Sequence, residues 1–214
     1  MEKYPKIQTV FLRDPATKHK TLLEGQFARP EFRYLADNRW LFTEKIDGTN
    51  IRVIWNADFH SVDLRGRADN SSVPPFLLDR LFEMLSVDLF ESQYPETSMT
   101  LYGEGYGDKI QKSGGKYISG GVSFILFDVL IDEYWLQRDG ILDIAEHLDI
   151  ACVPLIGTGT LHEGIDLVRD GFFSLVSEST LIAEGLVMRP VVDLWDRAGR
   201  RIIAKVKRKD FRQR

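Results

Sequence analysis

The order of apolar and polar residues divides the chain into alternating stretches, which predict strands, and stretches with helical spacing. In residues 41–56, LFTEKIDGTNIRVIWN, an apolar run is followed by a second run that alternates from residue 51 onward. Such alternation is typical of a strand with one buried face. The Asp47-Gly48 pair between the two runs is typical of a tight hairpin turn. The pattern therefore predicts a β-hairpin that holds Lys45 near its turn.

The remaining pattern predicts a mixed α+β domain. We expect further strands at His60–Leu64, Met99–Glu104, Val122–Val129, 153–157, Glu184–Arg189 and Ile202–Val206. We expect helices over residues 75–90, Gly140–Leu148 and His162–Asp170. The run from Val122 to Val129 is almost wholly apolar, which indicates a strand near the centre of a sheet. The order of elements favours a mostly antiparallel sheet with helices packed outside it.

Composition narrows the class of protein. The chain has 214 residues, 43% of them hydrophobic, and a net charge of −4, so any nucleic-acid binding must come from a local basic surface such as residues 197–214. Cys152 is the only cysteine, which excludes an intrachain disulfide. The start lacks an apolar signal core and no run reaches membrane-spanning length. We therefore expect a soluble, cytoplasmic protein without a membrane partner.

Polar residues recur at the ends of apolar strands. The segments are EKIDGTN, GRADN, YGEGYG, FILFDV, EGLVMRP and AKVKRKDF. Lys205 and Lys207 alternate, so both point to one side of a strand, where two like charges are costly unless an anion lies beside them. Arg67 offers a planar donor fork suited to phosphate. These features favour a cleft that binds a phosphate-rich nucleotide facing Lys45.

Each candidate also has an ordinary structural interpretation. Lys45 can be a surface cation in a salt-bridged turn, and the two lysines of the last strand can be solvated edge cations. Glu104 can cap a glycine turn, or it can join Glu184 in holding ribose hydroxyls or hydrated Mg²⁺. Phe127 can be a core residue or can stack on a base. The residues alone leave these alternatives open.

The six segments resemble, in order and spacing, the nucleotidyl-transfer motifs of the covalent nucleotidyltransferase superfamily. TEKIDGTN, EGLVMRP and KVKRKDF are similar to the ATP-dependent RNA ligase family, in the branch that seals nicked duplex RNA. The resemblance covers residues 43–211. It implies an antiparallel-sheet nucleotidyltransferase fold, ATP-grasp-like and specialised for ligase adenylation. We expect residues 1–214 to form this single domain, without a C-terminal OB-fold or other appended domain.

The resemblance implies the catalytic roles. Lys45 matches the nucleophile that attacks the α-phosphate of ATP and becomes lysyl-AMP. Lys205 and Lys207 match the pair that grips this phosphate. Glu184 matches the position that orders a hydrated metal, so the implied cofactors are ATP and Mg²⁺, with Mn²⁺ as an alternative. Since a free lysine is mostly protonated at neutral pH, neighbouring cations must favour its neutral form.

The resemblance also implies the nucleotide contacts. Glu44 matches a residue near the adenine amine, and Phe127 matches the aromatic residue that stacks on the base. Glu104 matches the glutamate that binds the ribose. Arg67 matches the arginine that positions phosphates and the RNA end, with Asn50 nearby. Ala68 departs from the small hydroxyl residue that usually follows this arginine.

The implied reaction joins RNA 3′-OH and 5′-phosphate ends. AMP passes from the lysine to the 5′-phosphate, and the 3′-OH then displaces it. The chain stops at Arg214, seven residues after Lys207, where related ligases continue into a second domain. Either the basic tail suffices for RNA or a protein partner replaces that domain. The alternatives are a capping-type guanylyltransferase, a DNA ligase, and a nucleotide- or RNA-binding module without turnover.

Overall fold

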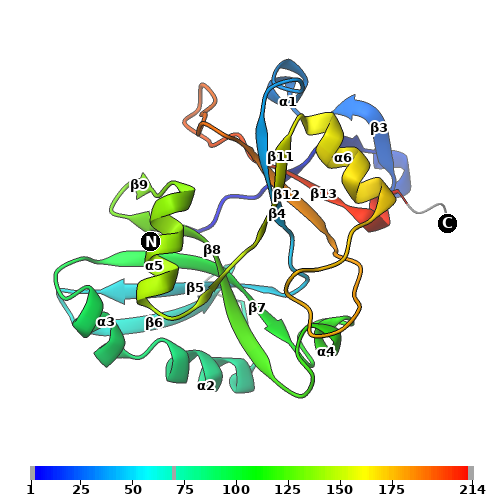
Figure 1. The fold of residues 1–214 in the computed structure, drawn as a ribbon. Helices are drawn as coiled ribbons and strands as arrows, with labels where there is room; N and C mark the ends of the chain where they lie inside the picture. Colours follow the sequence, from blue (N-terminus) through cyan, green and yellow to red (C-terminus); the bar gives the residue numbers. More distant parts are fainter. Residues whose placement is uncertain (1–2, 69–70, 212–214) are drawn as a thin grey trace. The chain divides into compact units, whose positions relative to one another are not determined.

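Two main β-sheets organise the computed structural model, and each belongs to its own compact unit (Figure 1). The structure describes residues 3–68 and 71–211. Unit 1 comprises the segment ending at Tyr4 together with Asp47–Val153 and Ser177–Ser179. Unit 2 comprises Pro5–Ile46, Pro154–Val176 and Thr180–Arg214.

Unit 1 contains a six-stranded sheet with the strand order β10-β8-β7-β5-β6, and β9 also pairs with β8. Its strands are β5 (Thr49–Asn56), β6 (Ser61–Gly66), β7 (Met99–Gly107), β8 (Val122–Ile131), β9 (Tyr134–Trp135) and β10 (Ala151–Cys152). The pairs are antiparallel except that β10 runs parallel to β8. The expected central position of β8 is therefore confirmed, since it lies between β7 and β10.

Helices cover the core of unit 1. They are α2 (Pro75–Met84), α3 (Val87–Gln93), α4 (Gly114–Tyr117) and α5 (Arg138–His147). The alternating residues Ile51, Val53 and Trp55 of β5 point into this core, as their period of two predicts. The single helix expected over residues 75–90 is instead two helices, because Ser86 accepts a hydrogen bond from the Leu89 N–H at 3.2 Å and so begins α3 as its N-cap.

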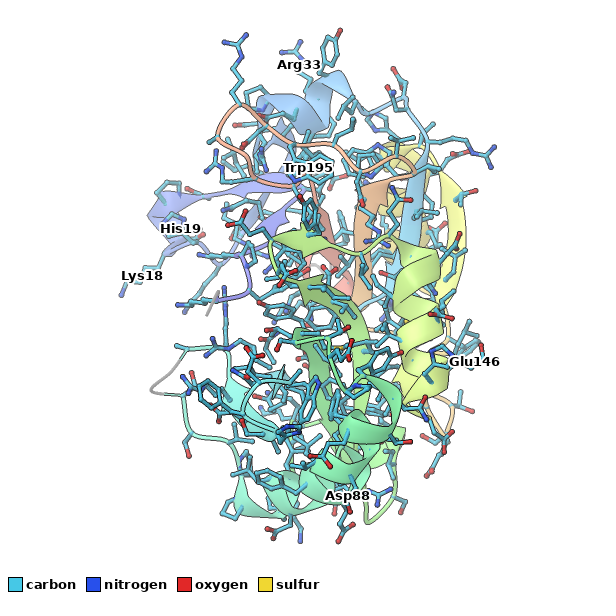
Figure 2. All side chains as sticks on the ribbon, turned by 90° about the vertical axis from the view of Figure 1, so that its left-hand side faces the viewer. Lys18, His19, Arg33, Asp88, Glu146 and Trp195 are labelled. Carbon is cyan, nitrogen blue, oxygen red and sulfur yellow. The ribbon has the colours of Figure 1, made fainter. Side chains whose placement is uncertain are left out.

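Unit 2 contains a five-stranded sheet with the order β1-β13-β12-β4-β11. Its strands are β1 (Gln8–Thr9), β4 (Trp40–Glu44), β11 (Leu155–Gly159), β12 (Gly185–Pro190) and β13 (Ala204–Lys207). The pairs are antiparallel except for β1 with β13. A separate pair is formed by β2 (Phe11–Arg13) and β3 (Leu22–Phe27). Between them, after the short helix η1 (Pro15–Thr17), Lys18 and His19 adopt positive φ angles and extend outward (Figure 2).

The core of unit 2 lies between its sheet and its helices. The helices are α1 (Pro30–Tyr34), α6 (Leu161–Asp170) and the short η2 (Arg208–Asp210). Trp40 of β4, Leu186 of β12 and Ile165 of α6 are buried together in it. A capping box between Thr160 and Glu163 begins α6.

The hairpin predicted for residues 41–56 is wrong. The first run forms β4 of the unit 2 sheet, and the second forms β5 of the unit 1 sheet. Neither Asp47 nor Gly48 has the positive φ angle that a type I′ hairpin turn requires. The mixed α+β class with antiparallel sheets and outer helices is confirmed, whereas the single nucleotidyltransferase domain stays a prediction. Within the part of the chain that the structure describes, no helix has the length and apolarity needed to span a membrane.

Candidate functional site

Lys45 directly follows the last residue of β4 in unit 2. Its backbone N–H donates to the Gly185 carbonyl at 2.9 Å, so the strand alignment continues through the lysine. Its side chain is 19% exposed. β12 lies beside β4, and β13 lies beside β12. Three neighbouring strands therefore bring three parts of the sequence together around this lysine.

A chain of ion pairs connects the ends of these strands. The Lys45 Nζ lies 2.6 Å from the Glu184 Oε2, and the Lys207 Nζ lies 2.6 Å from the Glu184 Oε1. The Lys45 Nζ also donates to the Ile46 carbonyl at 3.2 Å. Glu184 therefore holds two lysines at once, one on each oxygen. This arrangement joins three of the residues that the sequence predicted for the site.

The electrostatics of Glu184 follow from its position between two ammonium groups. Burial alone would raise its pKa, but the Lys45 and Lys207 charges outweigh burial and hold the pKa below its ordinary value. The carboxylate is therefore ionised at neutral pH. An ionised partner at 2.6 Å favours the ammonium form of Lys45.

Gly185 explains how Glu184 comes so close to β13. A Cβ atom at this position would lie 2.0 Å from the Val206 carbonyl oxygen, well inside van der Waals contact. Only glycine therefore allows β12 to begin this close to β13. The Arg208 N–H donates to the Glu184 carbonyl at 2.8 Å and fixes the adjoining backbone.

Lys205 and Lys207 lie on one face of β13, as their alternation predicted. Ala204 and Val206 are buried in the core of unit 2, whereas both lysines are only partly buried. Lys205 is paired in register with Val187 of β12. The two cations therefore share the face on which Glu184 meets Lys207.

Glu44 is a buried carboxyl group, 1% exposed, at the end of β4. Its Oε2 accepts a hydrogen bond from the Leu175 N–H at 2.9 Å, and its Oε1 has no hydrogen-bonding partner among the described residues. Burial raises the pKa of Glu44, although hydrogen bonds from Ser174 and Leu175 oppose this effect. The unpaired oxygen leaves one acceptor available for a ligand.

Three predicted residues lie on or next to neighbouring strands of unit 1. Asn50 of β5 is paired in register with Glu104 of β7. Arg67 follows Gly66, whose register partner is Ile51, so it lies at the same end of β5 as Asn50. Arg67 is exposed, and the Asn50 Oδ1 is buried without a hydrogen-bonding partner among the described residues. The sheet therefore gathers an amide, a carboxylate and a guanidinium.

Phe127 lies in an aromatic group at another part of the same sheet. Its ring meets the Tyr4 ring edge-on, with centroids 5.0 Å apart. The Tyr4 ring also contacts Tyr102, and its hydroxyl donates to the buried Asp128 Oδ2 at 2.8 Å. The N-terminal segment of unit 1 thus fixes the surroundings of Phe127. Nothing in the sequence pattern indicated Tyr4 as a neighbour.

Gly48 and Asp47 each have a structural role in unit 1. A Cβ at Gly48 would lie 2.3 Å from the Gly105 carbonyl oxygen, so this glycine permits close approach to β7. The Asp47 Oδ2 accepts a hydrogen bond from Ser113 at 2.6 Å, and its N–H donates to the Tyr117 hydroxyl at 3.3 Å. Two residues after the lysine, the chain is therefore anchored to the loop that leads into α4.

Comparison with known families places the chain in a family. The RNA ligase family model matches residues 38–207, which make up well over half of the chain and include every predicted site residue. The chain belongs to the RNA ligase family. Comparison with curated proteins found no match.

Solved structures show the same fold as this RNA ligase family member. An apo variant of Naegleria gruberi RNA ligase matches with a TM-score of 0.65 at 16% identity, over 97% of this chain and 57% of that chain. Another variant, with ATP and Mn, gives 0.66 at 17% identity, over 97% and 56%. A third, with AMP and Mn, gives 0.61 at 18% identity, over 83% and 52%. The chain therefore spans little more than half the length of these solved chains.

Proposed function

We propose that the chain is an ATP-dependent RNA ligase that acts through lysyl-AMP on Lys45. The observation that supports this most directly is the lysine at the end of β4, held 2.6 Å from a carboxylate that also holds Lys207. Membership of the RNA ligase family makes a polynucleotide end the expected substrate. A nucleophilic amine beside further cations suits attack on a phosphate.

In the proposed first step, the neutral Lys45 amine attacks the α-phosphorus of ATP. The ammonium form first gives one proton to solvent; as the N–P bond forms and the bond to the leaving pyrophosphate breaks, the nitrogen loses a second proton, which goes to pyrophosphate or solvent. The lysyl-bound AMP then passes to an RNA 5′-phosphate, and a 3′-OH displaces AMP to form the phosphodiester. Lys205 and Lys207 share one face of β13, where they can offset the charge on the reacting phosphate.

The resting ion pair sets a condition for attack. Lys45 loses its proton only when its contact with Glu184 weakens, because the lowered pKa of that carboxyl keeps the pair ionised. Any cation that draws the Glu184 charge away from Nζ therefore promotes the neutral amine. Lys207, on the other carboxylate oxygen, already shares that charge.

Glu184 also fits the role of a ligand for Mg²⁺ or Mn²⁺. Its Oε2 is buried and lies 2.6 Å from the Lys45 Nζ, at the mouth of the predicted phosphate site. A hard cation favours such an oxygen. When bound, this cation supplies charge neutralisation for the phosphate oxygens.

We assign the nucleotide contacts to the other predicted residues. Glu44, with its unpaired buried oxygen, would contact the adenine amine. Glu104 would bind the ribose and Phe127 would stack on the base. Arg67 and Asn50 would contact phosphates or the RNA end. We also propose that the ends lie in a nicked duplex and that a protein partner assists joining.

Intact-mass measurement tests the first step. The protein is incubated with Mg²⁺ and either ATP or GTP, and any adduct is mapped by peptide analysis. We expect an AMP adduct on Lys45 with ATP alone and no adduct in Lys45→Ala. Lys109→Ala, at an exposed lysine, is the matched control and should keep the adduct. An adduct from GTP alone would indicate a capping-type enzyme, and no adduct would indicate a binding module.

The joining step needs a separate measurement. Nicked RNA, DNA and hybrid duplexes with 5′-phosphate ends are compared for ATP-dependent sealing by the wild type. We expect sealing of RNA to exceed sealing of DNA. Sealing of DNA alone would contradict the RNA assignment while leaving adenylylation of Lys45 intact.

A further inference from the structure

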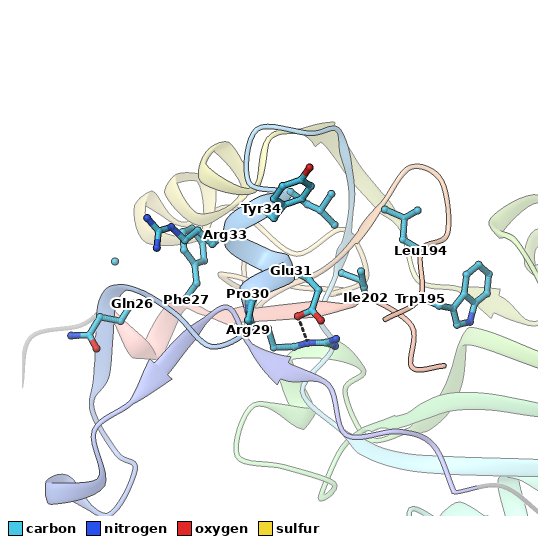
Figure 3. Close-up of a pocket in the computed structure, with 12 residues that line it drawn as sticks. Gln26, Phe27, Arg29, Pro30, Glu31, Arg33, Tyr34, Leu194, Trp195 and Ile202 are labelled. Atoms are coloured by element: carbon cyan, nitrogen blue, oxygen red, sulfur yellow. Dashed lines mark hydrogen bonds and ion pairs between the residues drawn. The ribbon is translucent and has the colours of Figure 1, made fainter. Parts of the chain in front are cut away.

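Unit 2 carries an open groove that the proposed reaction does not use (Figure 3). Its volume is about 1320 Å³. The lining residues come from the end of β3, from α1 and from the segment before β13: Gly25, Gln26, Phe27, Arg29, Pro30, Glu31, Arg33, Tyr34, Leu35, Leu194, Trp195 and Ile202. Its walls therefore combine aromatic, aliphatic and charged side chains.

Two large aromatic side chains of this groove are exposed to solvent. Tyr34 is 88% exposed and Trp195 is 52% exposed. Both come from fixed parts of the backbone. The Leu35 carbonyl beside Tyr34 accepts a hydrogen bond from the Trp40 indole at 2.8 Å, and Asp196 beside Trp195 accepts from two backbone N–H groups of its own turn. The cost of keeping such rings in water suggests that they serve a ligand.

The charges around the groove favour an anionic ligand. The Arg29 guanidinium is bonded to Glu31 and Asp196, and Arg200 is bonded to Asp196, so both carboxylates already face arginines. Arg33, which extends outward from α1 in Figure 2, is exposed and has no ion-pair partner among the described residues, and the same holds for Arg197. Among the charged residues that line the groove, Arg29 and Glu31 are paired with each other, and Arg33 is the exposed charge left for a ligand.

We propose that this groove binds a single-stranded segment of the RNA substrate. Bases would stack on Tyr34 and Trp195, while Arg33 and Arg197 would contact the phosphates. Exposed aromatic rings beside free arginines suit single-stranded nucleic acid, because every base has a face that can stack and every linkage carries a charge. The proposal names a second contact surface for the substrate and so rests on the proposed ligase function.

The position of the groove fits one continuous strand. Leu35 of the groove is bonded to Trp40, the first residue of β4, and Lys45 follows the last. At about 3.3 Å per residue, Lys45 lies about 17 Å along β4 from Trp40. A few nucleotides of extended strand cover that distance. The groove would therefore hold an unpaired stretch of RNA that continues past the base-paired end reacting at Lys45.

Tryptophan fluorescence provides a direct assay. Trp195 is 52% exposed, Trp40 and Trp55 are at most 1% exposed, and Trp135, in unit 1, is partly buried and does not line the groove. The part of the quenching that is lost in Trp195→Phe therefore reports on the groove. The full chain is titrated with an oligouridylate, with heparin as a polyanion without bases, and with a proline-rich peptide as a protein-like ligand. We expect quenching by the oligouridylate that is absent in Trp195→Phe.

Affinity for a labelled oligouridylate is then compared among variants. Tyr34→Ala and Trp195→Ala should each weaken binding about 10-fold, and Arg33→Gln should reduce the slope of log affinity against log salt by about one. Phe59→Ala removes a ring that is 79% exposed in unit 1 and should leave affinity unchanged. Unchanged affinity in both groove variants overturns the proposal, as does quenching by the peptide but not by the oligouridylate.

Adenylylation of Lys45 separates this proposal from the ligase assignment. The groove variants should still form the AMP adduct, because their rings lie away from Lys45 on β4. In the wild type, a normal adduct without any quenching by the oligouridylate refutes the groove alone. Quenching without any adduct in the wild type refutes the ligase assignment while the groove remains an RNA-binding surface.

Discussion

Replacing Glu184 by glutamine tests the ion-pair chain most directly. The amide has nearly the shape of the carboxylate but carries no charge, so Glu184→Gln removes two ion pairs with N–O distances of 2.6 Å each. Lys45 and Lys207 would then both lose the negative charge that lies between them. All three side chains are at most 20% exposed, so water screens the change only in part.

The loss of stability expected for Glu184→Gln can be estimated from the distances between the charged atoms. Two unit charges at 2.6 Å attract by about 6 kcal/mol at an effective dielectric constant of about 20. Much of that attraction is offset by the cost of removing the charges from water. Breaking a buried pair costs about 3–5 kcal/mol, and partial exposure places this site at the lower end. We therefore expect Glu184→Gln to lower the free energy of unfolding by about 3 kcal/mol at pH 7.

The pH dependence gives a second, independent check. The pKa of Glu184 is lowered in the folded state, so its contribution is fully present above the usual carboxyl pKa of about 4.3. It is lost as the pH falls through the lower folded pKa. The difference between wild type and variant should thus shrink below about pH 4.

Urea unfolding of both proteins from pH 7 to pH 3 measures this difference. Glu133→Gln, at an exposed glutamate, is the matched control and should stay within about 0.5 kcal/mol of wild type. Adding Lys207→Met to Glu184→Gln should restore part of the stability by removing one of the two facing cations. A loss that is the same at pH 7 and pH 3 would show that the charges are not its cause.

Three further substitutions have definite expected outcomes. Burial raises the pKa of Glu44, so the ionised carboxylate destabilises the folded state at pH 7. Glu44→Gln should therefore keep or raise the free energy of unfolding at pH 7 but not at pH 4. Urea unfolding at both pH values measures this difference, and a loss above about 2 kcal/mol at pH 7 would contradict it. Gly185→Ala places a Cβ 2.0 Å from the Val206 carbonyl oxygen, so thermal unfolding should show a loss of about 1–3 kcal/mol. Thr160→Ala removes the capping box with Glu163 and should cost about 1 kcal/mol in urea unfolding, with little effect on adenylylation.

Local sequence pattern predicted the elements that carry the ion-pair chain. Strict alternation at Lys205 and Lys207 placed both lysines on one face of a strand, and the structure has them there because Ala204 and Val206 fill the core. The place of Glu184 beside Lys45 could not come from alternation. It depends on the pairing of β4 with β12, which are far apart in the sequence. Only the resemblance of the motifs brought these residues together beforehand.

The predicted hairpin failed because turn chemistry was read without knowing the partners of each strand. Asp47-Gly48 favours a turn, but both flanking strands have other partners: β4 pairs with β11 and β12, and β5 pairs with β6 and β7. Each strand therefore forms hydrogen bonds with two partner strands, whereas a hairpin would have paired the two strands only with each other. Pairing between distant segments overrode the local preference.

Two other features of unit 2 could not be predicted from the spacing of apolar and polar residues. The hydrogen bond from Leu175 to Glu44 comes from an irregular segment, whose course depends on the fold of unit 2. Tyr34 and Trp195 lie in distant parts of the sequence, and each alone is an unremarkable surface aromatic. Their common groove depends on α1 and the Asp196 turn being placed together by the core. Such sites become visible only in three dimensions.

The division of the chain between the two units has a consequence for biosynthesis. Residues 47–153 form most of unit 1 without interruption, so this unit can acquire its core while the ribosome is still adding the remainder. Unit 2 needs segments from both ends of the chain. Lys45 emerges early but can meet Glu184 and Lys207 only after those much later residues have been translated. The reactive amine is therefore expected to gain its counter-ion only after unit 1 has had the chance to form its core.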